Sequence, residues 1–222
     1  NKQLKDMGTA EQRRHFRILA VLKGDKTIIP TGEDYINKND QVFVVTGKDY
    51  LPELLKIAGK ADEKLEKIMI LGGGKIGRKV AQSLEKRGID VIIVESDKAK
   101  SLKIAGQLEK TMVMHADGAE IDSIVREGIL GMDALVAVTS DDENNMIACL
   151  LAKHLGIRKT IALVNKVNYL PLMPVIGIDS TVNTQISTVN AIFRLIRRGG
   201  IVSVATFHGI DAEAIEVEVK AN

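Results

Sequence analysis

Residues 67–77 read KIMILGGGKIG, an apolar run that leads directly into three glycines and then a fourth. Gly72, Gly74 and Gly77 fit the pattern G-x-G-x-x-G. This pattern needs glycine for a tight turn, for close approach of a pyrophosphate to the backbone, and for packing of a helix on a sheet. We expect the apolar run to form a strand, and a helix to begin near Ile76 with its free N–H groups directed at phosphates. The pattern alone is weak, but its position between strand and helix favours nucleotide binding over a simple tight turn.

Four further apolar runs follow, each typical of a strand that is covered on both faces. Stretches of helical length separate them. Gly88 and Gly156 each follow a basic turn, which is a signal for the end of a helix. Ser140 stands three residues before Glu143, which predicts a capping box at the start of another helix. The alternation predicts an α/β fold, a Rossmann-like doubly wound parallel sheet. Its further strands are expected at residues 90–95, 111–114, 134–138 and 160–164.

Glu95 places a carboxylate at the end of the second predicted strand, eighteen positions after Gly77. A carboxylate there accepts hydrogen bonds from both ribose hydroxyls and repels a 2′-phosphate. The nucleotide expected is therefore NAD(H), with ATP or ADP as alternatives, rather than NADP(H). A solvated acid at a strand end is the competing interpretation for Glu95. Asp97 is a weaker candidate, since a role as N-cap of the next helix accounts for it.

Polar residues also follow the third and fourth predicted strands, as Asp117-Gly118 and Thr139-Ser140. Doubly wound sheets bind ligands at the carboxyl ends of their strands, so these residues could line the adenosine and the second ribose or phosphate. A turn and a helix N-cap explain them equally well. The expected nucleotide contacts are Gly72, Gly73, Gly74, Lys75, Ile76, Gly77, Glu95, Asp117, Gly118, Thr139 and Ser140.

The charge and hydropathy patterns exclude other classes of partner. The 31 basic and 29 acidic residues give a net charge of +2, whereas nucleic-acid binding calls for a clustered basic face. No apolar segment approaches the roughly 18 to 20 residues that span a bilayer. We therefore predict no nucleic-acid partner and no direct membrane insertion.

The chain carries no recognisable catalytic or metal-binding pattern. Its four histidines are scattered, no C-x-x-C or G-x-S-x-G motif occurs, and no P-loop motif is present. The acids in residues 141–143 could hold a hard cation, but an acidic first helical turn is the simpler explanation. Cys149, the one cysteine, lies in an apolar run and is expected to be a buried, inert thiol. We predict no catalytic residue and no metal site.

The flanking regions indicate a second kind of unit. Apolar stretches at residues 16–22 and 41–45, a turn at Gly24 and a helix over residues 51–57 predict a small α+β unit. Near the other end, residues 215–219 alternate as in a strand that has no obvious partner in this chain. The sequence is therefore expected to be cut from something longer at both ends.

These motifs resemble the RCK (KTN) family of nucleotide-binding domains. The resemblance rests on the glycine run, on VESD at 94–97, on Asp117-Gly118, and on residues 133–145. The stretch IRRGGIVSV at 196–204 is similar to the regulatory subunits of Trk potassium-uptake systems. The resemblance implies a partial RCK C-terminal lobe (1–61), a Rossmann-like nucleotide-binding lobe (66–198) and the start of a second C-terminal lobe (199–222).

The resemblance also implies a function. The chain would be a cytoplasmic regulatory subunit at the inner face of the cell membrane, gating a membrane-embedded potassium transporter subunit through NAD(H)- or ATP-dependent conformational change. It would form a homo-oligomer, a dimer or higher, through the helix near 185–198. An apolar stripe there fits, although plain core is the alternative. The stripe comprises Ile186, Val189, Ile192, Phe193 and Ile196. Ala116 and Asn165 depart from the family pattern, which leaves the choice of ligand open.

Two other functions stay open at this point. The chain could be a fragment of an NAD-dependent oxidoreductase that lacks its substrate domain, or an adenylate sensor for another kind of partner. A dehydrogenase needs a second domain with a substrate pocket and an acid or base. Because no segment of this sequence is long enough to supply that domain, we predict that the chain is not an enzyme.

Overall fold

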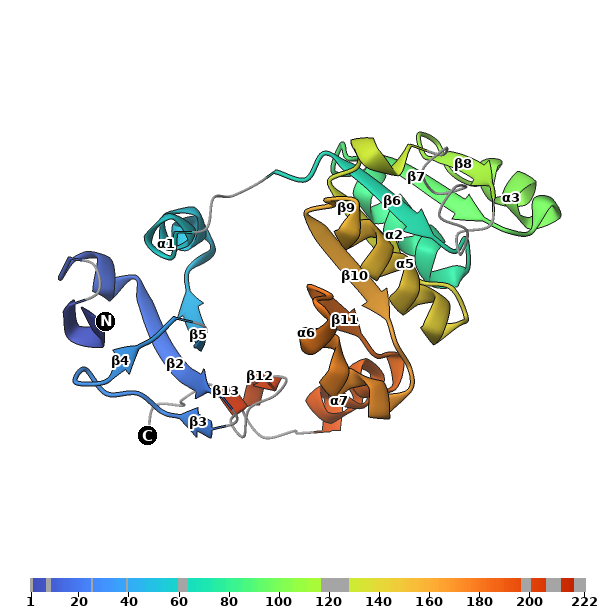
Figure 1. The fold of residues 1–222 in the computed structure, drawn as a ribbon. Helices are drawn as coiled ribbons and strands as arrows, with labels where there is room; N and C mark the ends of the chain where they lie inside the picture. Colours follow the sequence, from blue (N-terminus) through green and yellow to red (C-terminus); the bar gives the residue numbers. More distant parts are fainter. Residues whose placement is uncertain are drawn as a thin grey trace. The chain divides into compact units, whose positions relative to one another are not determined.

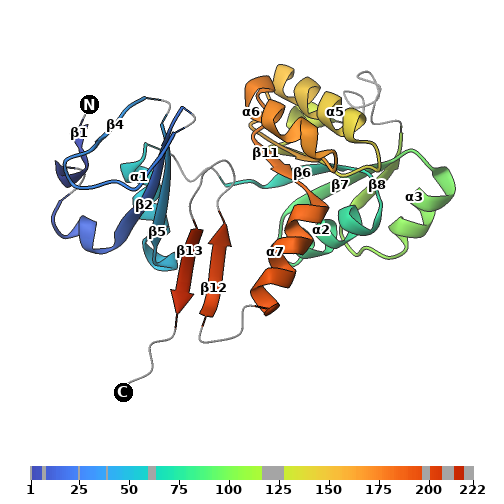
Figure 2. The same cartoon turned by 90° about the horizontal axis from the view of Figure 1, so that it is seen from below.

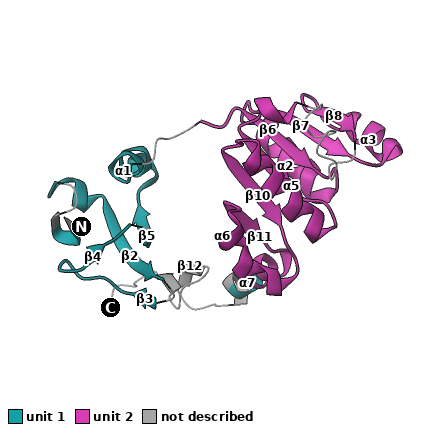
Figure 3. Ribbon diagram, in the orientation of Figure 1, with its two compact units in different colours: residues 1–63, 190–222 teal, residues 64–189 magenta. Residues whose placement is uncertain are grey.

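The computed structural model describes residues 2–6, 9–24, 26–38, 40–59, 64–116, 128–196, 201–206 and 213–217. The chain divides into two compact units (Figure 3). One comprises residues 64–189, and the other comprises residues 1–63 with 190–222.

The first unit contains a six-stranded parallel sheet with the order β11-β10-β9-β6-β7-β8 (Figure 1). The chain winds outward from β6 in one direction and then from β9 in the other, so the order reverses between these two strands. The doubly wound sheet is thereby confirmed, and the five predicted strands agree with the structure to within one residue at each end. The strands are β6 (Lys67–Leu71), β7 (Asp90–Glu95), β8 (Met112–His115), β9 (Ala134–Ala137), β10 (Lys159–Leu163) and β11 (Ser180–Val182).

Helices cover both faces of this sheet (Figure 2). Met69 and Leu71 point to one face, where they pack in a core with side chains of α5 and α6. Ile68 and Ile70 point to the other face, towards α2 and α3. Each fully buried aliphatic side chain of this kind contributes about 1.5–3 kcal/mol to folding. The helices are α2 (Lys75–Glu85), α3 (Lys98–Ala105), α5 (Asp142–His154) and α6 (Met173–Ile176), with 3-10 turns η4 (Ile129–Gly131) and η5 (Val167–Leu172). A further helix, α7 (Thr184–Ile196), begins in this unit and ends in the other.

The helix ends follow the sequence signals with one exception. Asp97 caps α3, accepting a hydrogen bond from the Lys100 N–H at 2.8 Å, and Gly88 and Gly156 have φ of +73° and +86°. The capping box on Ser140 was wrong. Asp141 is the N-cap of α5, and its carboxylate accepts from the Asn144 N–H at 2.8 Å. A carboxylate is the stronger acceptor at the positive end of a helix, so α5 starts one residue later than expected.

The second unit is built around antiparallel strands. Its three-stranded sheet has the order β3-β2-β5, and Gly24, with φ of +64°, lies between β2 and β3. The predicted apolar stretches and helix are confirmed. The elements are β1 (Lys2–Gln3), η1 (Leu4–Asp6), η2 (Gln12–Arg14), β2 (Phe16–Lys23), β3 (Lys26–Ile28), β4 (Tyr35–Ile36), β5 (Gln41–Thr46), η3 (Lys48–Tyr50) and α1 (Leu51–Ile57).

The last predicted strand does have a partner in this chain, contrary to expectation. Strand β13 (Glu213–Val217) pairs antiparallel with β12 (Ile201–Thr206). The sequence of β12, IVSVAT, is rich in β-branched residues and therefore suits a strand of its own. In the part of the chain that the structure describes, no helix is both long enough and apolar enough to cross a membrane.

Candidate functional site

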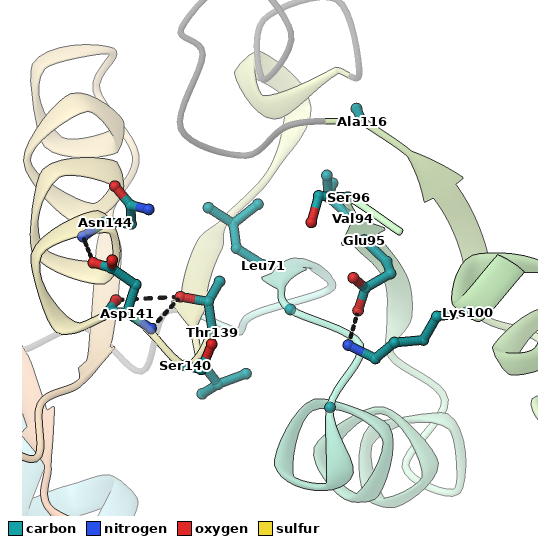
Figure 4. Close-up of a pocket in the computed structure, with 13 residues that line it drawn as sticks. Leu71, Val94, Glu95, Ser96, Lys100, Ala116, Thr139, Ser140, Asp141 and Asn144 are labelled. Carbon is teal, nitrogen blue, oxygen red and sulfur yellow. Dashed lines mark hydrogen bonds and ion pairs between the residues drawn. The ribbon is translucent and has the colours of Figure 1, made fainter. Parts of the chain in front are cut away.

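A pocket opens at the carboxyl ends of β6, β7 and β9, where the strand order of the parallel sheet reverses (Figure 4). This is where doubly wound sheets bind their ligands. The cavity volume is about 290 Å³, close to the lower end of the ~300–1,000 Å³ typical of small-molecule sites. Its lining comprises Leu71, Gly72, Gly74, Val94, Glu95, Ser96, Lys100, Ala116, Val138, Thr139, Ser140, Asp141 and Asn144.

Five of the predicted contact residues line this pocket: Gly72, Gly74, Glu95, Thr139 and Ser140. Gly73 and Gly77 are buried beside it in the loop and the first turn of α2. Lys75 and Ile76 are exposed on α2 and do not line the pocket. Asp117 and Gly118 lie outside the described residues.

The three glycines of the motif have separate reasons to be glycine. Gly72 has φ of +100°, and a Cβ on it would lie 2.9 Å from the Thr139 nitrogen. A Cβ on Gly77 would lie 2.0 Å from the Gly72 carbonyl oxygen, so this position needs glycine for packing. A Cβ on Gly74 would meet no described atom within 4 Å, and its φ of −64° suits any residue. Folding therefore accounts for Gly72 and Gly77, whereas Gly74 leaves free space in the pocket.

Gly74 is also the N-cap of α2, and no side chain of the described residues caps that helix. The first N–H groups of a helix need acceptors, and together with the helix dipole they favour an anion. The free space at Gly74 adjoins this helix end. The loop therefore fits a phosphate group held by backbone N–H groups.

Glu95 lies in the pocket wall beside the glycine loop, at the end of β7, and it is only 5% exposed. Its Oε2 accepts from the Gly73 N–H at 3.0 Å and pairs with the Lys100 Nζ at 2.5 Å, while Oε1 accepts from the Asp97 N–H at 3.1 Å. Burial alone would raise the pKa of Glu95, but the hydrogen bonds from Lys100, Asp97 and Gly73 outweigh it and lower the pKa. The group is an ionised acceptor at the pocket wall.

Thr139 belongs to a buried hydrogen-bond network below the pocket. Its N–H and its hydroxyl both donate to the Asn145 Oδ1, at 3.0 and 2.7 Å. The fully buried Asn145 amide in turn donates to the Thr139 and Leu163 carbonyls, at 3.2 and 2.9 Å. Asn145 thus ties the pocket loop after β9 to the end of β10.

The network continues from α5 to the start of α7. Asp142 accepts from the Asn165 and Lys166 N–H groups, at 2.8 and 2.7 Å. Asn165 Oδ1 accepts from the Thr184 hydroxyl at 2.5 Å, and Asn183 donates to the Asn165 carbonyl at 3.0 Å. Helix α5 carries both Asn145 and Asp142, so the two sets of hydrogen bonds together connect the pocket loop to the first turn of α7 through this helix.

The acids of residues 141–143 each have a protein partner. Asp141 caps α5, Asp142 holds the loop after β10, and Glu143 accepts from Lys166 and Tyr169 at 2.5 and 2.8 Å. Those two hydrogen bonds lower the pKa of Glu143 to about 2. Among the described residues no group of three or more His, Cys, Asp and Glu could hold a metal ion.

Two further residues, Cys149 and His115, lie in the same part of the molecule but do not line the pocket. Cys149 is fully buried, as predicted, and burial raises the pKa of its thiol to about 12. His115 contacts the Ser96 carbonyl through Nε2 at 3.0 Å and does not line the pocket. It behaves as an ordinary polar strand end.

Four residues in or beside the site were not predicted from the sequence: Lys100, Asp141, Asn144 and Asn145. Lys100 is found once Asp97 fixes the start of α3, because position 100 then lies in the first turn and can reach back to the strand end. Asp141 and Asn144 follow in the same way from the correct start of α5. The role of Asn145 had no local signal, since its partner Leu163 is eighteen residues away.

Two family models match the chain. The model of the TrkA-N domain matches residues 68–184, which is more than half of the chain. The model of the TrkA-C domain matches residues 1–59. The two matches fall on opposite sides of the boundary between the two units at residues 63 and 64.

Curated relatives are similar over most of the chain. The Trk system potassium uptake protein trkA homolog 1 of Methanosarcina mazei is 36% identical over 200 residues, 90% of this chain and 49% of that protein. The Trk system potassium uptake protein TrkA of Haemophilus influenzae is 31% identical over 207 residues, 93% of this chain and 45% of that protein. The chain spans about half the length of the curated relatives it matches.

Solved structures share the fold. The GsuK RCK domain aligns with a TM-score of 0.61 at 20% identity, covering 92% of this chain and 45% of that one. A GsuK channel bound to NAD aligns with a TM-score of 0.52 at 19% identity, covering 70% of this chain and 29% of that one. The NAD(P)-binding domain of an exopolyphosphatase-related protein from Archaeoglobus fulgidus aligns with a TM-score of 0.53 at 18% identity, covering 61% of this chain and 100% of that one. At these identities the likeness concerns the fold alone.

Proposed function

The chain belongs to the TrkA-N domain family, and on that premise we propose that it binds an adenine nucleotide and regulates a Trk-type potassium uptake system. The observation that carries the proposal is the glycine loop. Gly74 leaves free space beside the uncapped start of α2, at the point where the strand order reverses. Relatives named for Trk potassium uptake supply the physiological setting.

The nucleotide we propose is NAD(H), with ATP and ADP as alternatives. The amides of the loop from Gly72 to Gly77 would hold the phosphates, and Glu95 would accept from a ribose hydroxyl. Thr139 and Ser140 would contact the second ribose or phosphate, and Asp117 and Gly118 the adenosine. The GsuK channel bound to NAD supports this choice, since it shares the fold.

Regulation would act through the hydrogen bonds that join the pocket loop to α7. A ligand changes a conformational equilibrium only by binding its two states with different affinity. Thr139 would sense the nucleotide through Asn145 of α5. Asp142 of the same helix and Asn165 would couple that change to Thr184 at the start of α7. A membrane-embedded potassium transporter subunit would respond, from the cytoplasmic face of the membrane.

Helix α7 would provide the contact of a homo-oligomer, a dimer or higher. Val189, Ile192 and Phe193 lie on one face of α7 and remain 47%, 48% and 52% exposed. Ile186, also in the predicted stripe, is half-buried, and the Ile196 side chain lies outside the described residues. Light scattering at micromolar concentration tests this contact, and a monomer with and without NADH would contradict it.

The proposed domain organisation follows the family resemblance. Residues 1–61 would be a partial RCK C-terminal lobe, 66–198 the nucleotide-binding lobe and 199–222 the start of a second C-terminal lobe. We propose no enzymatic turnover. The titratable side chains that line the pocket, Glu95, Lys100 and Asp141, are each engaged by another residue of the chain.

Potassium uptake by cells tests the proposed function. Cells whose only copy of the whole protein carries Gly74→Val should take up potassium slowly, while cells with Gly106→Val should match the wild type. Gly106 is a suitable control, since it lies outside the pocket with φ of −75° and ordinary contacts. Normal uptake in the Gly74→Val cells would contradict the proposal.

A further inference from the structure

Glu95 has few free acceptor positions for hydrogen bonds from a ribose. A carboxylate offers about four lone-pair positions for hydrogen bonds. Three are in use, by the Gly73 N–H, the Asp97 N–H and the Lys100 ammonium. A ribose diol carries two hydroxyl donors, so it cannot place both on Glu95 while Lys100 stays where it is.

Lys100 is the partner of Glu95 that can move. The Gly73 and Asp97 donors are backbone groups, fixed by the glycine loop and by the start of α3. The Lys100 side chain is 46% exposed, lines the pocket and pairs with Glu95 through its terminal ammonium. In Figure 4 it reaches across the wall of the pocket to the carboxylate. No second partner of this ammonium is found among the residues the structure describes.

The pair also changes the charge at this side of the pocket. Glu95 alone would present a buried negative charge, which repels a phosphate on the neighbouring ribose oxygen. The Lys100 ammonium offsets that charge at 2.5 Å, and an ammonium is itself a good phosphate ligand. The pair should therefore reject a nucleotide with a ribose 2′-phosphate less strongly than an unpaired carboxylate would.

From these contacts we infer that Lys100 is the specificity-determining residue of the pocket, and that it admits adenine nucleotides carrying a ribose 2′-phosphate which Glu95 alone would reject. The inference rests on the proposed nucleotide binding. Wild-type chain would then prefer NADH over NADPH by less than about tenfold. Lys100 would turn from Glu95 to the 2′-phosphate when NADPH binds, and it would leave Glu95 to the hydroxyls when NADH binds.

The experiment titrates NADH and NADPH in parallel into the full chain and measures both dissociation constants by calorimetry. Lys100→Met should raise the ratio of the two dissociation constants at least tenfold by weakening NADPH, with NADH unchanged or tighter. Lys100→Arg should keep the wild-type ratio. Lys103→Met is the matched control, since it removes the same charge from the same helix outside the pocket.

A second variant keeps the test independent of how well Lys100→Met folds. Glu95→Gln removes the charge that Lys100 offsets, so its preference should turn towards NADPH, and Glu95→Gln with Lys100→Met should lose that preference. An unchanged ratio in both Lys100→Met and Glu95→Gln overturns the inference and leaves nucleotide binding intact. Absence of binding of either nucleotide to the wild type overturns the inference and the proposed function together.

Discussion

The two ends of the parallel sheet each carry a carboxylate bound to backbone N–H groups, and they differ in what lies beside it. At the amino end, Asp133 accepts from the N–H groups of Glu66 and Lys67, at 2.7 and 2.9 Å, and from Arg158. These bonds join the starts of β6, β9 and β10. At the carboxyl end, Glu95 borders an open cavity.

The difference assigns separate roles to the two ends. The partners of Asp133 all belong to segments of the sheet itself, so its bonds contribute to stability. The carboxyl end keeps free space at Gly74 and a movable partner at Lys100, neither of which the fold requires. Changes at Gly74 or Lys100 should therefore alter ligand binding with little effect on stability, and changes at Asp133 should do the reverse.

The largest effect is expected at Gly74. Gly74→Val should weaken NADH binding at least about 100-fold, because the side chain would occupy the space left for phosphate. Its melting temperature should stay close to that of the wild type, since a Cβ there meets no described atom within 4 Å. Calorimetry and thermal unfolding measure the two effects, with Gly106→Val as the control. Normal NADH affinity in Gly74→Val would mean that the loop is only a turn.

A smaller loss is expected at Glu95. Glu95→Ala removes a charged hydrogen-bond acceptor, and such bonds are typically worth about 1.5–3 kcal/mol. NADH should therefore bind roughly 10- to 150-fold more weakly by the same titration. Asp90→Ala is the control, because Asp90 is an exposed acid at the opposite end of the same strand. Equal losses in both variants would remove Glu95 from its proposed role.

At the amino end the expected change is in stability. Asp133→Asn should lower the melting temperature by several degrees and leave the dissociation constant of NADH within about twofold of the wild type. The replacement weakens acceptance from the Glu66 and Lys67 N–H groups and removes the ion pair with Arg158. A loss of NADH affinity as large as that of Glu95→Ala would contradict the division between the two ends.

The same residue predicts a dependence on pH. Hydrogen bonds from the Glu66 and Lys67 N–H groups and from Arg158 lower the pKa of Asp133 from 3.8 to about 2. Because the folded-state pKa is lowered, this contribution is complete above about pH 4 and is lost as the pH falls through 2. Denaturant unfolding of wild type and Asp133→Asn between pH 5 and 2 should converge at the acidic end. A constant difference in stability over that range would exclude the mechanism.

The sequence predicted what depends on local pattern. The strand that ends at Leu71, the glycine turn and the acid at position 95 are all read from continuous runs or fixed spacing. The start of α5 was missed by one residue, because Ser140 and Asp141 are both good caps and only the folded chain selects between them. The strand β12 was not predicted, because the last predicted strand was assumed to have no partner in this chain.

The part of the site that could not be predicted depends on side-chain contacts between separate helices and strands. Lys100 meets Glu95 only because Asp97 starts α3 at the end of β7. Asn145 meets Leu163 only because β9 and β10 are neighbours in the sheet. The Lys100 contact follows from the start of α3, whereas the Asn145 contact follows from the order of the strands in the sheet, which the sequence pattern leaves undefined.

The central claim is that a nucleotide binds in the pocket at the carboxyl ends of the strands, and NMR of the isotope-labelled full chain tests it most directly. On titration with NADH, the amide signals of Gly72, Gly74 and Thr139 should shift or broaden. Those of Asp133 at the opposite end of the sheet, and of Val21 in β2, should stay in place. Unchanged signals at Gly72, Gly74 and Thr139 with saturating NADH, or shifts confined to residues 1–59, would contradict the account.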